Sequence, residues 1–237
     1  MLPSPRYIHP IIFIIALASM NVFAFKLSPM KAEFGHKGKG ATRSFRIIND
    51  TPEKIKVEAE IMSRNIDLNN NETRSETDLF TLYPPQLEVE AGKSKVIRVS
   101  YIGDKESVEK AYRLIVRQFP SDKKPEKSGG QINILFEYVA SLYVTPKDAR
   151  PNLKIKNAKK LNNSLSINFV NEGNKHTLLK NYRLNLKQGK KSKTIDFTEE
   201  KYKNLATQNI LAGLERKIIV EDDQFKVGKI EAKFVKK

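Results

Sequence analysis

The sequence predicts an all-β protein made of two sandwich domains, and three observations support this. Apolar and polar residues alternate along many short stretches, among them residues 55–61 and 96–99. Such alternation is typical of strands that have one face on a core and the other in water. Turn-forming residues separate these stretches, and a helical period of useful length is missing. A short segment with two prolines, Pro146 and Pro151, divides the chain in two.

The first 24 residues predict a secretory signal peptide that is not part of the fold. A weakly basic start precedes an apolar run at residues 11–18, and Val22 and Ala24 stand at the positions that a signal peptidase reads. The run is too short to span a bilayer. We therefore expect cleavage after Ala24, export, and no stable membrane insertion. A leader that stays attached as an interfacial anchor is the alternative.

Residues 25–146 are expected to form the first domain. Alternating stretches come first, at residues 45–47, 55–61, 87–89 and 96–99. Longer apolar runs follow at residues 111–119 and 132–144, as expected for strands buried on both faces. Turns are predicted between these stretches at residues 49–52, 83–85, 91–92 and 128–130.

Residues 147–152 are almost devoid of apolar side chains and predict a stiff linker. Alternation then resumes in residues 153–237, the second domain, at residues 153–155, 165–169, 182–186, 217–220 and 229–235. A single helical turn is expected within residues 198–205. Two blocks of about a hundred residues with regularly spaced strands fit two immunoglobulin-like sandwiches joined at an angle.

The formal net charge of +16 indicates an anionic partner, which can be a nucleic acid, an anionic membrane face or an acidic protein. The lysines are spread along the whole chain and are not gathered on one element with aromatic residues between them. Export also separates the protein from cytoplasmic nucleic acid. We interpret most of the charge as solvated surface and expect no nucleic-acid partner.

The chain shows no pattern typical of an enzyme, a metal site or a cofactor site. It has no cysteine, which excludes thiolate chemistry, and His36 and His176 each lack a second ligand at metal spacing. The glycine-rich segment at residues 35–40 lacks the spacing of a phosphate-binding loop, and no helix pattern follows it. We interpret this segment as a turn, and both histidines as surface or structural residues.

The last apolar run of the first domain carries Ile132, Ile134, Phe136 and Tyr138 on one face. These side chains either fill the core of their own domain or lie on an edge strand that offers its backbone to another chain. Proteins usually blunt exposed edges with charge or proline, and residues 132–136 carry neither. Both interpretations stay open on the pattern alone.

Four segments resemble, in the same order along the chain, segments of the PapD-like periplasmic chaperones of the chaperone–usher pathway: residues 91–98, 109–120, 132–146 and 171–176. The resemblance covers most of the chain after the leader and implies two immunoglobulin-like domains without enzymatic activity. It implies a periplasmic protein that binds a pilus subunit by donating a strand and delivers it to an outer-membrane usher. The subunit-binding side chains would be Ile132, Ile134, Phe136 and Tyr138.

The resemblance also implies two basic residues that hold the C-terminal carboxylate of the subunit. Lys31 falls where the first is expected, although a solvated lysine at a strand edge is the alternative. The second should lie seven residues before Pro146, where this chain has Val139. Either Arg113 or Arg117 takes that role, or the register of the subunit is set differently.

A third implied feature is an interdomain charge cluster. Arg98 and Glu109 match two of its members, and Asp223 is the preferred third, with Asp222 next. For Arg98, an outward position on a half-exposed strand is the alternative. A homodimer that covers its own donor strands is a further option. The alternative function is a secreted two-domain adhesin or carbohydrate-binding module, which would bind a surface ligand directly.

Overall fold

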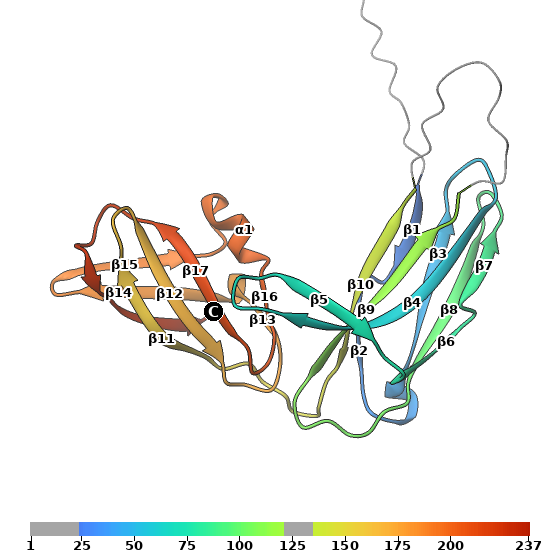
Figure 1. The fold of residues 1–237 in the computed structure, drawn as a ribbon, viewed down its shortest axis with the longest axis horizontal. Helices are drawn as coiled ribbons and strands as arrows, with labels where there is room; N and C mark the ends of the chain where they lie inside the picture. The colour runs from blue at the N-terminus through green and yellow to red at the C-terminus, as the bar shows by residue number, and fades with distance from the viewer. Residues whose placement is uncertain (1–23, 121–134) are drawn as a thin grey trace, which may run out of the picture.

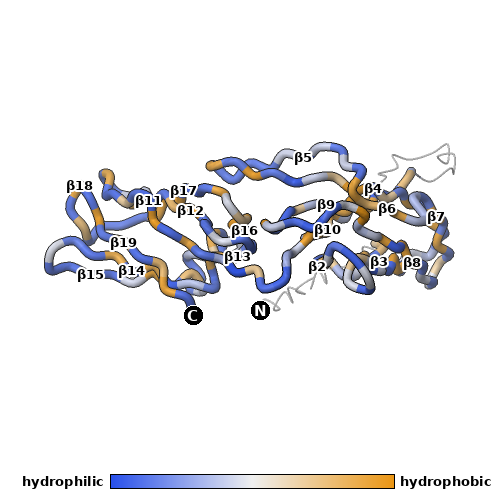
Figure 2. The backbone as a smooth tube through the Cα atoms, turned by 90° about the horizontal axis from the view of Figure 1, so that it is seen from below, coloured by the Kyte–Doolittle hydropathy of each residue, from blue (hydrophilic) through white to orange (hydrophobic). Residues whose placement is uncertain are grey.

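The computed structural model describes residues 24–120 and 135–237, which form two β-sandwich domains at an angle to each other (Figure 1). The predicted all-β fold is confirmed: within these residues the only α-helix is α1 (Lys203–Ala206). No helix in the described ranges is long and apolar enough to cross a membrane. In Figure 2, hydrophobic and hydrophilic residues alternate along many of the strands, as the sequence predicts.

The N-terminal domain contains two sheets. Across the first sheet the strands are β1 (Phe25–Ser28), β3 (Thr42–Asn49), β8 (Ser94–Tyr101) and β6 (Phe80–Tyr83). Across the second they are β2 (Lys31–Phe34), β10 (Glu137–Val144), β9 (Lys110–Gln118), β4 (Ile55–Ile66) and β5 (Glu72–Glu76), and β7 (Gln86–Val89) also pairs with β4. A 3-10 turn at Gly38–Ala41 precedes β3.

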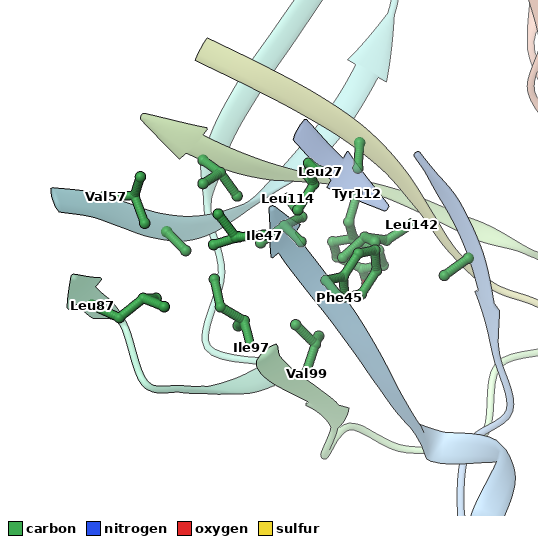
Figure 3. Close-up of a cluster of buried hydrophobic side chains, with 14 of the residues drawn as sticks. Leu27, Phe45, Ile47, Val57, Leu87, Ile97, Val99, Tyr112, Leu114 and Leu142 are labelled. Carbon is green, nitrogen blue, oxygen red and sulfur yellow. The ribbon is translucent and has the colours of Figure 1, made fainter. Parts of the chain in front are cut away.

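The core of this domain lies between the two sheets (Figure 3). Alternation decides which side chains enter it: Ile97 and Val99 of β8 are fully buried, whereas Arg98 between them is exposed. In β9 the run from Leu114 to Val116 is buried on both faces of the sheet, as its continuous apolar pattern predicts.

The first part of the chain changes sheets at Pro29. Before it, β1 pairs with β3; after it, β2 pairs with β10 in parallel, with Lys31 opposite Ser141 and Phe34 opposite Val144. Because β2 begins only at Lys31, it covers only the second half of β10. In the described part of the chain, residues 137–140 of β10 therefore pair with β9 alone.

The C-terminal domain also encloses a core, which includes Ile167, Phe169 and Leu184. One sheet contains β17 (Glu215–Glu221), β12 (Ser164–Asn171), β11 (Leu153–Lys160) and β18 (Gly228–Lys229). A second contains β15 (Lys191–Asp196), β14 (Tyr182–Gln188) and β19 (Glu231–Lys236), and β13 (Thr177–Leu178) pairs with β16 (Asn209–Ile210). Short 3-10 turns lie at Leu179–Asn181 and at Glu200–Tyr202, directly before α1.

The predicted linker, residues 147–152, lies between β10 and β11 and is hydrogen-bonded to a turn of the C-terminal domain. The amide of Asn174 donates to the carbonyl of Arg150 at 3.0 Å, and the amide of Glu172 donates to that of Asn152 at 2.9 Å. Gly173 sits so close that a Cβ there would lie 2.2 Å from the carbonyl oxygen of Arg150. The linker is thus packed against the second domain.

Two further contacts join the domains. A small apolar cluster contains Ile66 and Tyr143 of the first domain and Leu211 of the second. The hairpin of β4 and β5 extends from its sandwich toward the C-terminal domain (Figure 1). Its turn accepts a hydrogen bond from the backbone amide of Lys217 at the carbonyl of Leu68, 3.3 Å away.

Candidate functional site

A cavity of about 610 Å³ lies where the two domains meet. Side chains from both domains line it: Lys31, Glu33, Arg64, Arg113, Ser141 and Tyr143 from the first, and Lys175, His176, Thr177, Leu178, Asn181, Thr207 and Asn209 from the second. Apart from His176, four of these residues are cationic and one is acidic, so the cavity suits an anionic ligand.

Strand pairing brings two predicted cations, Lys31 and Arg113, to the same place. Ser141 of β10 pairs with Lys31 of β2 on one side and with Arg113 of β9 on the other. Residues paired across a sheet point to the same face. Lys31 and Arg113 therefore flank Ser141 on the face that lines the cavity. The guanidinium of Arg113 donates to the hydroxyl of Ser141 at 2.6 Å.

Arg113 is held in place by a carboxylate from the β4–β5 hairpin. Its guanidinium binds both oxygens of Glu72, at 3.0 and 2.5 Å. Arg64 and Arg74 donate to the same carboxylate at 2.6 and 2.8 Å. Burial raises the pKa of the Glu72 carboxyl, but the hydrogen bonds from Arg113 and Arg74 and the charge of Arg64 outweigh burial and lower it to about 2. This network orients Arg113 and occupies much of its hydrogen-bonding capacity.

Glu72 makes a testable contribution to acid stability. Its pKa is about 2 in the folded protein and near 4.5 when unperturbed, so its stabilising effect is complete above about pH 4.5 and is lost as the pH falls toward 2. We expect wild type to lose about 1 kcal/mol more stability than Glu72→Gln between pH 6 and pH 3, since solvent screens part of the interaction. Urea unfolding at both pH values measures this, and parallel losses in the two proteins would contradict it.

Of the four lysine and arginine side chains that line the cavity, that of Lys31 is the most exposed, at 54% of its full accessible surface. Its ammonium lies 3.5 Å from Glu33, 3.2 Å from Nε2 of His176 and 5.4 Å from the ring centre of Tyr143. Lys175 also pairs with Glu33, at 3.0 Å. Burial raises the pKa of the Glu33 carboxyl, and Lys175 and Lys31 together lower it below its usual range. Lys31 is therefore placed to meet an anion that enters the cavity.

His176, which lines the cavity, contacts Glu109 behind it, and both side chains are buried. One oxygen of Glu109 accepts from the backbone amide of His176 at 2.8 Å and lies 2.5 Å from Nδ1 of its ring. The other accepts from the hydroxyl of Thr145 at 2.8 Å. The imidazole stacks on the ring of Tyr143, with the ring centres 3.9 Å apart. This contact brings together residues of β10 and of the second domain.

Of the predicted subunit-binding residues, Ile132 and Ile134 lie outside the described residues. Phe136 is half-buried and packs against the core of the first domain. Tyr138 is half-buried as well: its hydroxyl donates to the carbonyl of Phe25 at 2.5 Å, and the two rings meet edge to face. Leu135 beside them is 49% exposed. Phe136 and Tyr138 thus make substantial contacts within their own domain.

Three residues bear on the second predicted anchor: Val139, which stands at the expected position, and the candidate replacements Arg113 and Arg117. Val139 is half-buried and shares the face of Ser141 on β10. Arg113 lines the cavity beside Lys31. Arg117, four residues further along β9, instead pairs on the surface with Glu60 and Glu137. The structure therefore brings Arg113, and not Arg117, to Lys31.

The predicted interdomain cluster of Arg98, Glu109 and Asp223 does not come together. Glu109 lies at the domain boundary, but its partners are His176 and Thr145. Arg98 is exposed on β8 in the first domain. Lys217, near the start of β17, contacts the first domain, whereas Asp223 follows the opposite end of that strand. Alternation predicts that Arg98 points away from the core, and the outward alternative is the correct one.

Asp222, the second choice for the cluster, is buried at that same remote end of the C-terminal domain. It pairs with Lys160 at 3.2 Å and with Lys193 at 2.9 Å. Burial raises the pKa of its carboxyl, but the hydrogen bonds from Lys193, Phe225 and Lys160 lower it overall. Asp222 therefore stabilises its own domain.

Sequence reasoning did not place three residues in the cavity: His176, which was interpreted as a surface or structural histidine, Lys175 and Arg64. For His176 and Lys175 the available signal was the segment at residues 171–176, which resembles the family, although its side chains were not assigned to a site. Among the described residues no group of three or more His, Cys, Asp or Glu side chains forms a metal site.

Comparison with known proteins identifies the family. Residues 31–150 match the family model described as pili and flagellar-assembly chaperone, PapD N-terminal domain. The chain belongs to the PapD family of pilus-assembly chaperones. Its members are chaperones and not enzymes, so the family assignment favours the chaperone interpretation over the adhesin. No curated protein sequence matches this PapD-family chain significantly.

Solved chaperone structures share the fold of this PapD-family chain. It is similar to the CsuC–CsuE chaperone–tip subunit complex from archaic Csu pili of Acinetobacter baumannii, with 17% identity and a TM-score of 0.56 over 82% of this chain and 89% of that one. The class 5 fimbriae chaperone CfaA gives 14% and 0.61 over 89% and 98%. The SafB chaperone in complex with SafA pilin from Salmonella enterica gives 13% and 0.56 over 84% and 85%.

Proposed function

We propose that this chaperone binds pilus subunits by donating a β-strand from residues 132–140 and delivers them to an outer-membrane usher. The half-paired edge of β10 carries the proposal. Residues 137–140 pair with β9 on one side, while β2 begins only opposite Ser141. An unpaired edge offers backbone N–H and C=O groups to an incoming strand, and such pairing supplies affinity in strand addition.

The position of β2 indicates how a guest strand lies. β2 runs parallel to β10 and starts at Lys31. A guest strand that occupies the open edge of β10 and runs in the direction of β2 has its C-terminus at Lys31. There the terminal carboxylate meets the ammonium of Lys31, with Arg113 beside it. The open edge and the cationic cavity thus serve the same guest.

Side chains of the donor segment supply the rest of the affinity. Ile132 and Ile134 have the sequence parity of Phe136 and Tyr138, whose side chains face the core of the first domain. Since Phe136 and Tyr138 contact their own domain, we assign the main contacts with the guest to Ile132 and Ile134. Each buried isoleucine would contribute about 1.5–3 kcal/mol before ordering costs.

Location and partners follow from the same proposal. The predicted signal peptide at residues 1–24 directs the chain to the periplasm, where subunits await assembly. The solved CsuC–CsuE and SafB–SafA complexes each contain a chaperone with a pilus subunit, which supports a subunit as partner here. In the absence of a subunit, two copies of the exposed edge pair in a self-capping homodimer.

Replacing Ile134 with arginine tests strand donation. We expect Ile134→Arg to reduce the amount of subunit that co-purifies from periplasmic extract at least ten-fold, because it places a charge in an apolar groove. Asn133→Arg is the matched control: it adds the same charge one residue away, at the opposite parity, and should leave co-purification near the wild-type amount. Mass spectrometry identifies and quantifies the bound subunit.

Equal subunit recovery with wild type and Ile134→Arg would overturn strand donation. A loss with Asn133→Arg as large as that with Ile134→Arg would also count against it, because the binding face would then not follow strand alternation. Circular dichroism of both variants shows whether the chaperone itself is folded.

A further inference from the structure

His176 makes contacts with two charged groups of the first domain through its two ring nitrogens. Nδ1 lies 2.5 Å from the carboxylate of Glu109, and Nε2 lies 3.2 Å from the ammonium of Lys31. The ring is fixed on one face by Tyr143, with an interplanar angle of 10°. The side chain is only 7% exposed. His176, a residue of the C-terminal domain, therefore contacts Lys31, a cation that lines the cavity from the N-terminal domain.

The chemistry of these neighbours assigns the proton on the imidazole. A carboxylate can only accept a hydrogen bond, so Nδ1 carries the proton that faces Glu109. An ammonium can only donate, so Nε2 is unprotonated and accepts from Lys31. The backbone amide of His176 donates to the same carboxylate oxygen at 2.8 Å, which fixes the residue further. His176 is thus a neutral acceptor in a fixed orientation.

Lys31 needs such a partner because its own surroundings restrain it weakly. Its side chain is largely exposed, and its ion pair with Glu33 spans 3.5 Å, while Glu33 is shared with Lys175. A lysine side chain loses considerable rotamer freedom when it is held in one position. An acceptor on the opposite wall, already fixed by Glu109, lowers the further ordering that a bound anion requires.

We propose that His176 is a positioning residue that holds the ammonium of Lys31 in the cavity for the carboxylate of the guest chain. The inference rests on the proposed function, in which Lys31 is the carboxylate anchor, and it adds that the anchor depends on the second domain. The anchor is complete only when the two domains are docked, because Lys31 and His176 belong to different domains.

Two substitutions separate the two contacts of the ring. An asparagine amide occupies the position of Nδ1, so His176→Asn keeps a donor for Glu109 and loses the acceptor for Lys31. A glutamine amide reaches the position of Nε2, so His176→Gln keeps an acceptor for Lys31 and loses the donor for Glu109. Each variant therefore keeps one of the two contacts and loses the other, and both introduce an amide side chain.

The experiment titrates acetate, as a probe for a carboxylate, into the full-length chaperone, with acetamide as the neutral control. Binding is followed by NMR through the backbone amides of Lys31, Arg113 and Ser141. We expect His176→Asn to weaken acetate binding about five-fold, the effect of losing one ordinary hydrogen bond, because the bond that orients Lys31 is lost while Lys31 itself remains. His176→Gln should stay near wild type. Thermal unfolding should give the reverse order, with His176→Asn the more stable variant because it keeps the contact with Glu109.

This crossed order distinguishes positioning from a merely structural role, in which affinity and stability would fall together. Nitrogen-15 shifts of the wild-type ring should also show Nδ1 protonated and Nε2 unprotonated. If wild type binds acetate and His176→Asn binds it equally well, the inference is overturned while the anchor stands. If wild type shows no binding of acetate at these amides, the Lys31 anchor itself fails, and the inference fails with it.

Discussion

Replacing Asn171 with alanine is expected to lower the free energy of unfolding of the C-terminal domain by about 3–5 kcal/mol, because it leaves several buried backbone groups without partners. Asn171 is fully buried at the end of β12. Its Nδ2 donates to the carbonyls of Lys175, Ile210 and Leu211 at 2.8, 3.2 and 3.3 Å. Its Oδ1 accepts from the amides of Asn152 and Gly173 at 3.0 and 3.1 Å.

The position of Asn171 connects stability to function. Its bonds join the linker at Asn152 to the turn that carries Lys175 and His176 into the cavity. We therefore expect Asn171→Ala to weaken acetate binding as well as folding. Asn157→Ala, at an exposed position on β11, is the control and should change stability by less than about 0.5 kcal/mol. Urea unfolding followed by circular dichroism measures the stability of both variants. A loss below about 1 kcal/mol for Asn171→Ala would show that these hydrogen bonds do not stabilise the domain as proposed.

Replacing Arg216 with methionine is expected to cost about 2–4 kcal/mol and to release the β4–β5 hairpin from the C-terminal domain. Arg216 is 1% exposed. Its guanidinium donates to the carbonyl of Asp67, to Oδ1 of Asn70 at 2.8 Å and to the carbonyl of Asn209 at 3.2 Å. Methionine fills similar space but leaves these acceptors without a donor.

Hydrogen exchange is the measurement for this variant. The amides of Asn69, Asn70 and Asn71 in the hairpin turn should exchange faster in Arg216→Met than in wild type. The control is Lys217→Met, which removes a neighbouring exposed cation but keeps the backbone bond from residue 217 to Leu68. Unchanged exchange in the turn of Arg216→Met would show that the hairpin is held by other contacts.

Asn49 and Asn171 illustrate how far sequence reasoning reaches. Asn49 was expected in a turn, Asn171 begins a segment that resembles the family, and both end a strand of their sandwich. The structure adds that both are fully buried: Nδ2 of Asn49 donates to the carbonyls of Glu53 and Val89, at 2.7 and 2.9 Å. A turn signal does not reveal this, because an asparagine that caps its own turn and one that bonds a distant loop have the same local sequence pattern.

For the charged residues and His176, local sequence patterns did not predict which side chains contact one another. Arg113 and Arg117 both lie on β9, and both were candidate anchors, but only Arg113 pairs with the position on β10 that also faces Lys31. His176 was interpreted as a surface or structural residue, and the structure adds that it lies against Lys31, 145 residues away along the chain. Arg98 was matched to an interdomain cluster, with an outward position as the alternative, and the structure shows it exposed on β8.

The amino-acid sequence alone determined the all-β class and the faces of the strands, because strand alternation has a period of two and is a local property. The candidate cations Lys31 and Arg113 came from the resemblance to the chaperone family and not from alternation. Only the tertiary structure decided which of these side chains meet. Neighbours in the cavity are set by the register of β2 and β9 on β10 and by the docking of a second domain. These are contacts between segments far apart in the sequence, and the spacing of residues along a single strand does not predict them.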